Sequence, residues 1–430
     1  MLQLLTWATC AILLLFNLRR LAFLLAAAYD LLRPRSPDRT PQDVPALGLT
    51  ARSVGEPSAT HHVLILVPLR NEVRSLPGLL AALLALDYSP SSLTIGLIDD
   101  GSTDSSSRLM DEFASSYAEV VVLHNATSLG KANALNAGLR QWPQGDLVMV
   151  YDADARPRPD SLRQIVAAFD DPMVAGAGGL IQPSNGLKTP AATYSALERL
   201  VHQQVTQRAK DRLDLAPALL GSHSAYRRHD LELAGGFPGG ALLEDSQLTI
   251  TFARQGRRTR FLLDAVATDH VPETLHSYWR QHVRWGRGFH DVALQQTATS
   301  APPPPKGSTL RSAISRRQAG RLVLRFELWM FALGYLDRLA LLIGATLLAI
   351  DNVTRSRSKK SKAMAALIGV NLILPYVQIA LALVAERASL AWWLRLPLVP
   401  FFFLIDIAAA AWSILLSLAR RPKRWQQTER

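Results

Sequence analysis

Short apolar runs alternate with helical patterns along the central region of the chain. The apolar runs lie at residues 63–68, 93–100, 119–125 and 146–154, and the helical patterns lie at 75–88, 102–117 and 130–142. Uninterrupted apolar runs of this length are typical of strands buried on both faces of a parallel sheet. Strands that alternate with helices therefore predict an α/β fold with a mostly parallel sheet. A later strand, residues 260–269, is expected to return to the same edge of that sheet.

The two ends of the chain contain long stretches without charge. Residues 1–32 predict an N-terminal anchor helix, and the basic pair at 19–20 favours a cytoplasmic basic end. Residues 363–385 and 396–419 are each long enough to cross a hydrocarbon core of about 30 Å. Asp406 interrupts the second stretch. An acid at that depth faces other helices or a polar path, or it is paired in the bundle or near an interface.

Residues 322–350 are apolar but are split by Asp337 and Arg338. A full span here would place the basic loop 354–362 outside the cell, against the positive-inside tendency. We therefore expect this segment to lie on or dip into the membrane, which gives three spans, or four if it crosses. The proline-rich and basic stretch 301–321 would rest on anionic headgroups.

These patterns predict an integral membrane protein, in the plasma membrane, with its central domain in the cytoplasm. The predicted parts are a membrane anchor (1–32), a linker (33–60), the central domain (61–300), an interfacial and membrane segment (301–350), transmembrane helices (351–419) and a basic cytoplasmic tail (420–430).

Charge and cysteine content narrow the classes of partner. The chain has 430 residues and a formal net charge of +12. Much of the excess flanks apolar segments, which favours anionic membrane lipids over nucleic acid. A nucleic-acid binder would need basic and aromatic residues along one groove, and the sequence has no such pattern. The one cysteine, Cys10, lies in an apolar run, so we expect neither an intrachain disulfide nor a cysteine metal site.

Polar residues follow the predicted strands where a parallel sheet binds its ligands, at the carboxyl ends. Pro68 and Glu72 follow the first strand, and Asp99 and Asp100 end the second. Capping of the next helix explains residues 102–104 but leaves the two acids unexplained. Their carboxylates suit the hydrogen-bond donors of a nucleotide base or ribose.

Asp152 and Asp154 end the fourth predicted strand. If the strand continues through them, both side chains point the same way, because side-chain direction in a strand has a period of two. Two close carboxylates suit Mg²⁺ or Mn²⁺, which often bridge protein oxygens and phosphates. The simpler alternative is an acidic turn before residues 156–159.

Two helix starts also carry charged candidates. Lys131 follows Gly130, where an ammonium and free amides suit a phosphate, although an ordinary helix start fits equally well. Glu244 and Asp245 begin another helix, and the helix dipole alone favours acids there. The functional alternative is that one of them is a general base near an acceptor hydroxyl.

Gln281, Arg284 and Trp285 share one helical face by their spacing. Arginine suits a diphosphate, and tryptophan offers a flat face to a sugar or base. The alternative is an interfacial helix rich in arginine and aromatic residues, as membrane proteins often have.

The order and spacing of these motifs resemble the family 2 inverting glycosyltransferases, whose fold is of GT-A type. The matching segments, within about residues 62–290, are "VPLRNE", "IDDGSTD", "GKANALNAGL", "DAD", "AGGF", "LLED" and "QHVRW". The resemblance is strongest to the membrane-embedded cellulose, hyaluronan, chitin and poly-N-acetylglucosamine synthases, which carry a Q-x-x-R-W motif. Ceramide glucosyltransferase, which adds a single sugar, is similar in motif and architecture.

This resemblance implies a UDP-sugar donor and a Mg²⁺ or Mn²⁺ ion held by Asp152 and Asp154. It implies that Asp245, with Glu244 beside it, deprotonates the acceptor hydroxyl, which then attacks the anomeric carbon with inversion. The residues expected to contact donor or acceptor are Pro68, Glu72, Asp99, Asp100, Lys131, Asp152, Gln281, Arg284 and Trp285.

Two features depart from the family pattern. The synthases often have more spans, and the acidic pair common after the late strand appears here as residues 268–270, "TDH". His270 could be a third metal ligand or an ordinary surface or hydrogen-bonded histidine. The leading expectation is a polysaccharide synthase, and the alternative is a single-addition enzyme acting on a membrane lipid. A non-catalytic scaffold is a third possibility, against which the intact acidic motifs and Arg284 argue.

Overall fold

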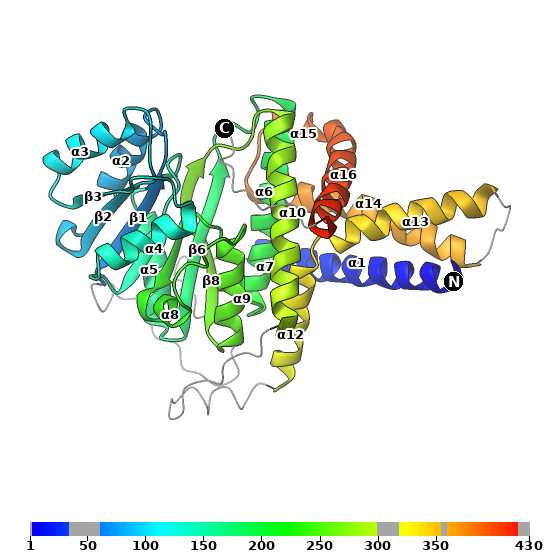
Figure 1. Ribbon diagram of the computed structural model, residues 1–430. Helices are drawn as coiled ribbons and strands as arrows, with labels where there is room; N and C mark the ends of the chain where they lie inside the picture. The colour runs from blue at the N-terminus through cyan, green and yellow to red at the C-terminus, as the bar shows by residue number, and fades with distance from the viewer. Residues whose placement is uncertain (1, 34–60, 299–317, 354–358, 420–430) are drawn as a thin grey trace.

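The computed structural model describes residues 2–33, 61–298, 318–353 and 359–419 (Figure 1). The predicted linker, the proline-rich stretch up to residue 317, residues 354–358 of the basic loop and the C-terminal tail lie outside these residues. The described part of the central domain is an α/β fold, as predicted. Its strands are β1 (Val63–Leu69), β2 (Leu93–Asp99), β3 (Val120–His124), β4 (Leu147–Val150), β5 (Arg156–Pro157), β6 (Val174–Pro183), β7 (Ser224–Arg227) and β8 (Arg258–Asp269).

These strands form one mixed sheet in the order β3-β2-β1-β4-β7-β6-β8-β5. The pairs β1/β2, β2/β3, β1/β4 and β6/β8 are parallel, and β7 runs antiparallel between β4 and β6. The short β5 pairs antiparallel with β8 and so brings the segment after β4 to the far edge of the sheet. The carboxyl ends of β1, β2 and β4 therefore meet on one side, where the sequence motifs lie.

Helices and short turns connect and cover the strands (Figure 1). In the central domain these are α2 (Leu76–Leu84), η1 (Pro90–Ser92), α3 (Ser106–Ser116), α4 (Lys131–Gln141), α5 (Ser161–Ala167), η2 (Ala168–Asp170), α6 (Pro190–Val201), η3 (His202–Gln207), α7 (Arg208–Arg212), α8 (Arg228–Leu233), α9 (Glu244–Arg254) and α10 (Leu275–Ala298).

The sheet separates two apolar cores. Alternate side chains of β1 face opposite sides, as strand geometry requires, so Ile65 packs in one core and Leu66 in the other. The first core joins β1 and β2 to α2, α3 and α5, and the second joins them to α4, α8 and α9. Because β1 is buried along nearly its whole length, its continuous apolar sequence is explained by packing on both faces.

A π-helical turn, η3, lies between α6 and α7. It contains six residues, His202–Gln207, and continues α6 into α7 as one rod. The π-turn packs against α1 (Leu2–Leu32) and α14 (Lys359–Ala385), which come from the apolar ends of the chain. The α6–η3–α7 rod is therefore one of the places where the central domain contacts the apolar helices.

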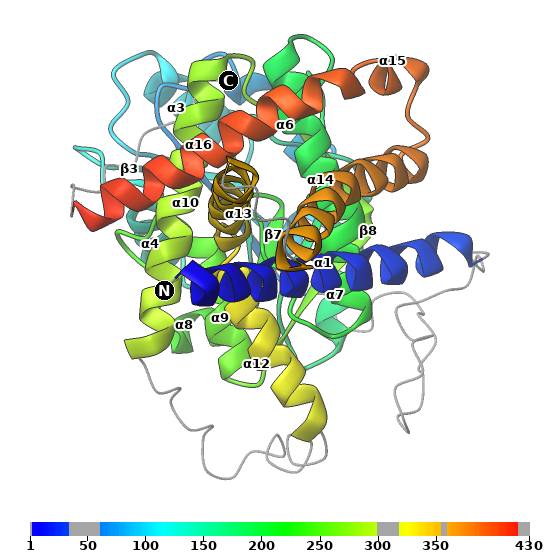
Figure 2. The same cartoon turned by 90° about the vertical axis from the view of Figure 1, so that its right-hand side faces the viewer.

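The apolar helices project to one side of the sheet domain (Figure 1). Besides α1 and α14 they are α12 (Gln318–Ala332), α13 (Leu336–Val353), α15 (Leu390–Trp393), η4 (Leu396–Leu398) and α16 (Val399–Leu418). Figure 2 shows α16 crossing α10, against which it packs.

In the described part of the chain, three segments are long and apolar enough to span a membrane: Gln3–Leu32, Lys359–Ala385 and Leu390–Leu418. A fourth becomes possible if the bent pair Leu322–Ala332 and Leu336–Val353 forms one span. This count matches the prediction of three or four. The orientation of the spans and the plasma membrane location stay predictions.

The bent pair differs in one detail from the sequence interpretation. The two helices meet at 67°. The break lies at residues 333–335, before Asp337 and Arg338, and both of these residues belong to the first turn of α13. Asp337 is buried and its charge is paired: Arg338, which is half-buried, bonds it, and Arg20 of α1 also contacts it. Asp406 of α16 is likewise paired within the bundle, by Arg338 at 3.0 Å.

Candidate active site

A cavity of about 1350 Å³ lies between the carboxyl ends of the strands and the apolar helices. One wall is formed by the loops after β1 and β4 and by the start of α9, and the opposite wall by α6 and α10. The cavity continues to α1, α14 and α16, where Phe16, Phe23, Ile379 and Phe403 line it. The predicted site residues that line it are Pro68, Glu72, Asp100, Lys131, Asp152, Asp154, Glu244, Asp245, Gln281, Arg284 and Trp285.

The two acids after β2 have different surroundings. Asp99 points into its own turn, where its carboxylate accepts bonds from the Ser102 amide at 2.8 Å, the Ser107 hydroxyl at 2.5 Å and His124 Nδ1 at 3.1 Å. Burial opposes ionisation of Asp99, but these hydrogen bonds outweigh it and lower its pKa. The structure therefore does not bring Asp99 to the cavity with the others. Its geometry is that of a residue that orders the β2–α3 turn.

Asp100 holds the loop before α4 and also lines the cavity. Its carboxylate accepts bonds from the Ser128 hydroxyl at 2.7 Å and from the Leu129 and Gly130 amides at 2.7 and 3.0 Å. Gly130, the residue before α4, has a φ of +79°, which glycine adopts without strain. Asp100 thus fixes the loop that delivers Lys131 to the cavity.

Asp152 and Asp154 lie on a turn, because β4 ends at Val150 and does not continue through them. The expectation of a continued strand was wrong here. The Asp152 amide bonds the Ser222 hydroxyl at 2.9 Å, and the Ala155 amide bonds the Asp152 carbonyl. Both carboxylates nevertheless line the cavity.

The end of β8 comes to the same place, as predicted. The backbone amide of His270 donates to Asp154 Oδ2 at 3.2 Å. The His270 side chain is exposed and lines the cavity, and the hydrogen bond to Asp154 is donated by its backbone amide. Its role as a metal ligand therefore stays a prediction.

Lys131 lies at the centre of an acidic group. Its Nζ donates to Asp152 Oδ1 at 2.7 Å and to the Gly221 carbonyl at 2.8 Å, and it lies 3.7 Å from Glu244 Oε1. Burial alone would lower the pKa of Lys131, but Asp152 and Glu244 outweigh it and raise the pKa. The ammonium therefore stays charged and draws the loop after β4 and the segment before β7 toward the start of α9.

Asp245 is the acid of this group with the most perturbed ionisation. Its Oδ1 accepts the Ser246 amide at 2.6 Å. Its Oδ2 lies close to Gly221, at which a Cβ atom would come within 2.9 Å of that oxygen. Burial and the neighbouring Glu244 carboxylate raise the pKa of Asp245 to about 7, and Lys131 and Arg284 only partly oppose them. A carboxyl group with this pKa is suited to exchange a proton near neutral pH.

Helix α10 supplies the opposite wall. Gln281 is buried, and Arg284 and Trp285 are half-buried. The Arg284 Nη1 atom lies 3.5 Å from the Leu242 carbonyl, next to the start of α9. All three side chains line the cavity, so the predicted helical face is present and is directed at the acidic group.

Comparison with known protein families identifies the family to which the chain belongs. A family model described as "Glycosyltransferase like family 2" matches residues 61–288, which is more than half of the chain. The chain belongs to glycosyltransferase family 2. Its fold is the GT-A type of that family, flanked by helices apolar enough to span a membrane.

Several curated relatives of this family 2 chain are glycosyltransferases. A probable glycosyltransferase, YdaM, of Bacillus subtilis is 31% identical over 237 residues, which cover 54% of this chain and 56% of that protein. A beta-monoglucosyldiacylglycerol synthase of Synechocystis sp. is 28% identical over 286 residues, covering 64% and 57%. An N-acetylglucosaminyltransferase of Rhizobium meliloti is 29% identical over 245 residues, covering 54% and 56%. The chain thus spans a little over half the length of these relatives.

A solved structure resembles the described chain as a whole. The mannosyltransferase PcManGT of Pyrobaculum calidifontis, in complex with GDP-Man and Mn²⁺, has a TM-score of 0.65 and 21% sequence identity. The match covers 98% of this chain and 100% of that chain. At this identity the match demonstrates a shared fold that includes the apolar helices.

The donor atoms of this family 2 site fit a divalent cation. Asp152 and Asp154 offer carboxylate oxygens from one turn at the cavity wall, and Mg²⁺ and Mn²⁺ prefer such ligands. The Lys131 ammonium already lies on Asp152 Oδ1, so positive charge is stabilised at this point of the wall. The residues present therefore suit a divalent ion at this point of the cavity wall.

Sequence reasoning missed the residues that close the cavity on the membrane side. Arg19 and Arg20 of α1, Glu198 of α6 and Arg338 of α13 line it. They belong to no motif, and hydropathy identifies the helices without identifying which face is turned inward. The charged pair at 337–338 was visible in sequence, and it was read as an interruption of a span.

Proposed function

We propose that the protein is a membrane-bound inverting glycosyltransferase that transfers a sugar from a nucleoside diphosphate sugar to an acceptor held in the membrane. The observation that carries this proposal is the continuity of the cavity. It reaches from Asp245 and Lys131 at the strand ends to apolar side chains of α1, α14 and α16. A water-borne acceptor would not need apolar walls at one end of the same cavity.

The residues at the sheet end have the chemistry of the donor site. The loop held by Asp100 would accept the nucleoside, next to Pro68 and Glu72 on the loop after β1. Lys131 and Arg284 would stabilise the negative charge that develops on the departing diphosphate. A divalent ion bound by Asp152 and Asp154 would supply further charge neutralisation of that leaving group.

The acceptor end has a base and a flat surface. Asp245 takes the proton of the acceptor hydroxyl, and the acceptor oxygen forms a bond to the anomeric carbon. The bond from that carbon to the diphosphate oxygen breaks on the opposite face, so the configuration inverts. Glu244 and Lys131 hold Asp245 in a polar group, and Trp285 offers a ring face to the sugar.

The acceptor that the geometry favours is a lipid that presents a hydroxyl group to Asp245. The lipid's apolar part would lie along the cavity wall formed by Phe16, Phe23 and Phe403. The Synechocystis relative, which is 28% identical to this chain, is named as a beta-monoglucosyldiacylglycerol synthase, and this name agrees with a lipid acceptor. The second candidate is synthesis of a polysaccharide, because Gln281, Arg284 and Trp285, which line the cavity, resemble a motif that polymer synthases share with the single-addition ceramide glucosyltransferase.

Product size distinguishes the two candidates. Purified full-length protein in detergent or liposomes with a bacterial lipid extract is incubated with Mn²⁺ and a panel of labelled UDP- and GDP-sugars. We expect label in a single chloroform-extractable glycolipid, and high-molecular-weight material would favour the polymer instead. Absence of transfer from every donor would contradict both.

Two controls connect this assay to the site. Asp245→Asn should lower transfer by about 10²–10⁴-fold and leave nucleotide binding within a few-fold, because only the base is lost. Chelation of divalent ions should abolish transfer, and added Mg²⁺ or Mn²⁺ should restore it in the wild type but not in Asp154→Asn. Loss of nucleotide binding in Asp245→Asn would contradict the assignment of the base.

A further inference from the structure

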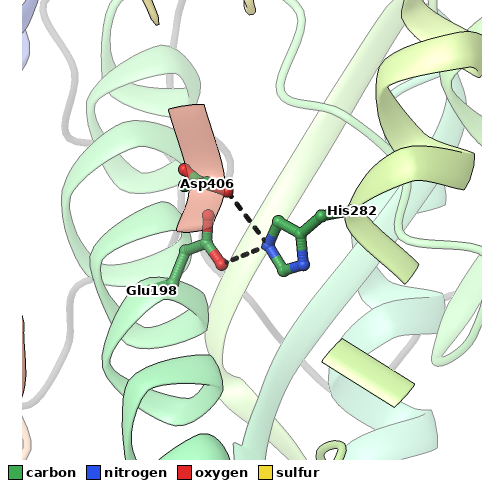
Figure 3. Close-up of side chains that lie close together, drawn as sticks. All are labelled: Glu198, His282 and Asp406. Carbon is green, nitrogen blue, oxygen red and sulfur yellow. Dashed lines mark hydrogen bonds and ion pairs between the residues drawn. The ribbon is translucent and has the colours of Figure 1, made fainter. Parts of the chain in front are cut away.

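A second charged cluster lies beside the cavity, at the junction of the catalytic domain and the apolar helices. His282 of α10, Glu198 of α6 and Asp406 of α16 converge there, as Figure 3 shows. His282 Nε2 lies 2.8 Å from Glu198 Oε2 and 3.7 Å from Asp406 Oδ1. The side chains of His282 and Asp406 are each 1% exposed. Three elements that are distant in sequence thus meet at one imidazole.

The geometry determines the charge of that imidazole. His282 Nδ1 lies 2.9 Å from the backbone carbonyl of Tyr278, which can only accept a hydrogen bond. Nε2 faces two carboxylates, which also accept. A neutral imidazole has one donor nitrogen, whereas both nitrogens of an imidazolium donate. His282 is therefore an imidazolium. Its burial would lower its pKa, but Glu198 and Asp406 outweigh this effect and raise the pKa to about 9.

The same ligand atoms could instead chelate a transition metal through a neutral Nε2. Arg338 argues against this arrangement, because its Nη2 occupies Asp406 Oδ2 at 3.0 Å and its Nη1 bonds Asp337. Arg20 also contacts Asp337. The cations of this network then balance its carboxylates: His282, Arg338 and Arg20 face Glu198, Asp406 and Asp337. A divalent cation would add two positive charges to a network whose three cations already balance its three carboxylates.

His282 also packs against neighbouring side chains of its own helix, α10. Its ring stacks on Tyr278 at 3.9 Å and meets Trp285 edge-on at 5.0 Å between ring centroids. His282 lies between Gln281 and Arg284 in sequence. Its ion pairs therefore attach the turn of α10 that carries these site residues to α6 and α16. A displacement of this turn of α10 would move Arg284 and Trp285 with it.

We propose that His282 is a positioning residue whose ion pairs with Glu198 and Asp406 hold α10 so that Arg284 and Trp285 face the reacting groups. This role rests on the proposed glycosyl transfer, because positioning is defined by that reaction. His282 itself does not line the cavity and so does not contact substrate. The pairs connect catalytic helices to a membrane helix, and they therefore couple the site to the helices that bring the acceptor.

The test is a charge-balance cycle in the full-length protein. His282→Gln removes the imidazolium and leaves the Glu198 carboxylate without this cation. The resulting displacement of α10 lowers the rate, because a displacement of about 1 Å at the site can cost roughly 100-fold. We expect kcat to fall by about that factor while the KM for the donor changes less than about threefold, because the donor loops are untouched. Adding Glu198→Gln removes the excess carboxylate and should recover at least about tenfold of kcat. His290→Gln, on the same helix near Ser417, is the matched control and should stay near wild type.

Three outcomes would overturn the proposal. His282→Gln could behave like His290→Gln, the double variant could be no better than His282→Gln alone, or metal analysis could find one transition ion per chain that is lost in His282→Gln. Melting temperatures of the four cycle members keep the test independent of activity, because an ion pair predicts coupled effects on stability. If the wild type transfers no sugar at all, the proposed function fails, and the melting cycle still decides whether the ion pair exists.

Discussion

Asp245 is the residue on which the proposed chemistry depends most directly. Its perturbed ionisation has two structural sources, burial at the start of α9 and the carboxylate of Glu244 beside it. An acid at a helix start is ordinarily stabilised as a carboxylate by the helix dipole. Burial and Glu244 oppose that tendency here. A carboxyl group with a pKa of about 7 can accept a proton and release it in each turnover.

The sign of the resulting pH dependence follows from this pKa. Asp245 must be deprotonated to act as a base, and its pKa is raised to about 7. Transfer should therefore be low at pH 5.5 and should increase to a plateau as the pH rises through about 7. The measurement is kcat against pH at saturating donor and metal. A profile that is flat between about pH 5 and 8 would contradict the assignment, because an ordinary aspartate would already be ionised there.

The sequence predicted the acids at the strand ends because parallel strands place their carboxyl ends together. It could not separate Asp99 from Asp100, since the partners that direct Asp99 into its turn include His124, which is distant in sequence. It also identified Asp152 and Asp154 for a reason that proved wrong in part. β4 ends before these two residues, so they lie on a turn. The hydrogen bond from the Asp152 amide to the Ser222 hydroxyl holds that turn at the cavity wall.

At the scale of elements, one pair of motifs is explained by a direct contact. The Asn136 side chain of α4 donates to the Phe237 carbonyl at 2.6 Å and accepts the Phe237 amide at 2.8 Å. Gly236 has a φ of +82°, and a Cβ there would come within 2.5 Å of Asn136 Oδ1. The segments "GKANALNAGL" and "AGGF" therefore occur together because one helix side chain satisfies the backbone of the other segment.

This contact predicts an effect on stability. Asn136→Ala should lower the free energy of unfolding by about 1–3 kcal/mol, because it leaves the amide and carbonyl of Phe237 without their partner. Asn133→Ala is the control, since Asn133 is exposed and bonds only a carbonyl of its own helix region, and it should change stability by less than about 0.5 kcal/mol. Denaturant titration of both variants measures the difference. Equal effects would mean that the Asn136 contact does not hold the loop.

The first strands were predictable because each is a continuous apolar run. β6 and β7 were not, since "VAGAGGLIQP" consists mostly of small residues, with Val174 and Ile181 as its only β-branched ones, and "SAYR" is only four residues long. Their extended form depends on pairing with β4 and β8. Small residues also serve packing there: a Cβ on Gly179 would come within 2.3 Å of both the Ala265 carbonyl and the His223 ring.

At the scale of the whole molecule, ion pairs attach the catalytic domain to the N-terminal helix. Asp30 of α1 accepts bonds from Arg208 at 2.8 Å and Arg212 at 2.7 Å, both on α7. Arg208 is buried, whereas Asp30 is half-buried. Hydropathy predicted α1 and its length, but the partner of a single acid at its end could not be read from sequence, because it lies on a helix of the central domain.

Removal of this acid should loosen the junction. Asp30→Asn leaves the buried Arg208 guanidinium without its carboxylate, which should cost about 2 kcal/mol, below the value for a fully buried pair because Asp30 is partly exposed. The measurement is thermal unfolding in detergent with limited proteolysis of α1. Glu112→Gln, which breaks an exposed pair with Arg108, is the control and should cost less than about 1 kcal/mol. Identical melting of the two variants would contradict an energetic role for the junction.

The π-turn η3 has a consequence for how this architecture can vary. Such a turn holds one residue more than a regular helix, and one residue corresponds to a rotation of about 100°. The π-turn takes up that extra residue, so deleting a single codon within His202–Gln207 would restore a regular helix and leave both Glu198 and Arg208 on their present faces. Relatives that lack one residue here would therefore keep the ion pair between Arg208 and Asp30 and attach the same central domain to α1 in the same orientation.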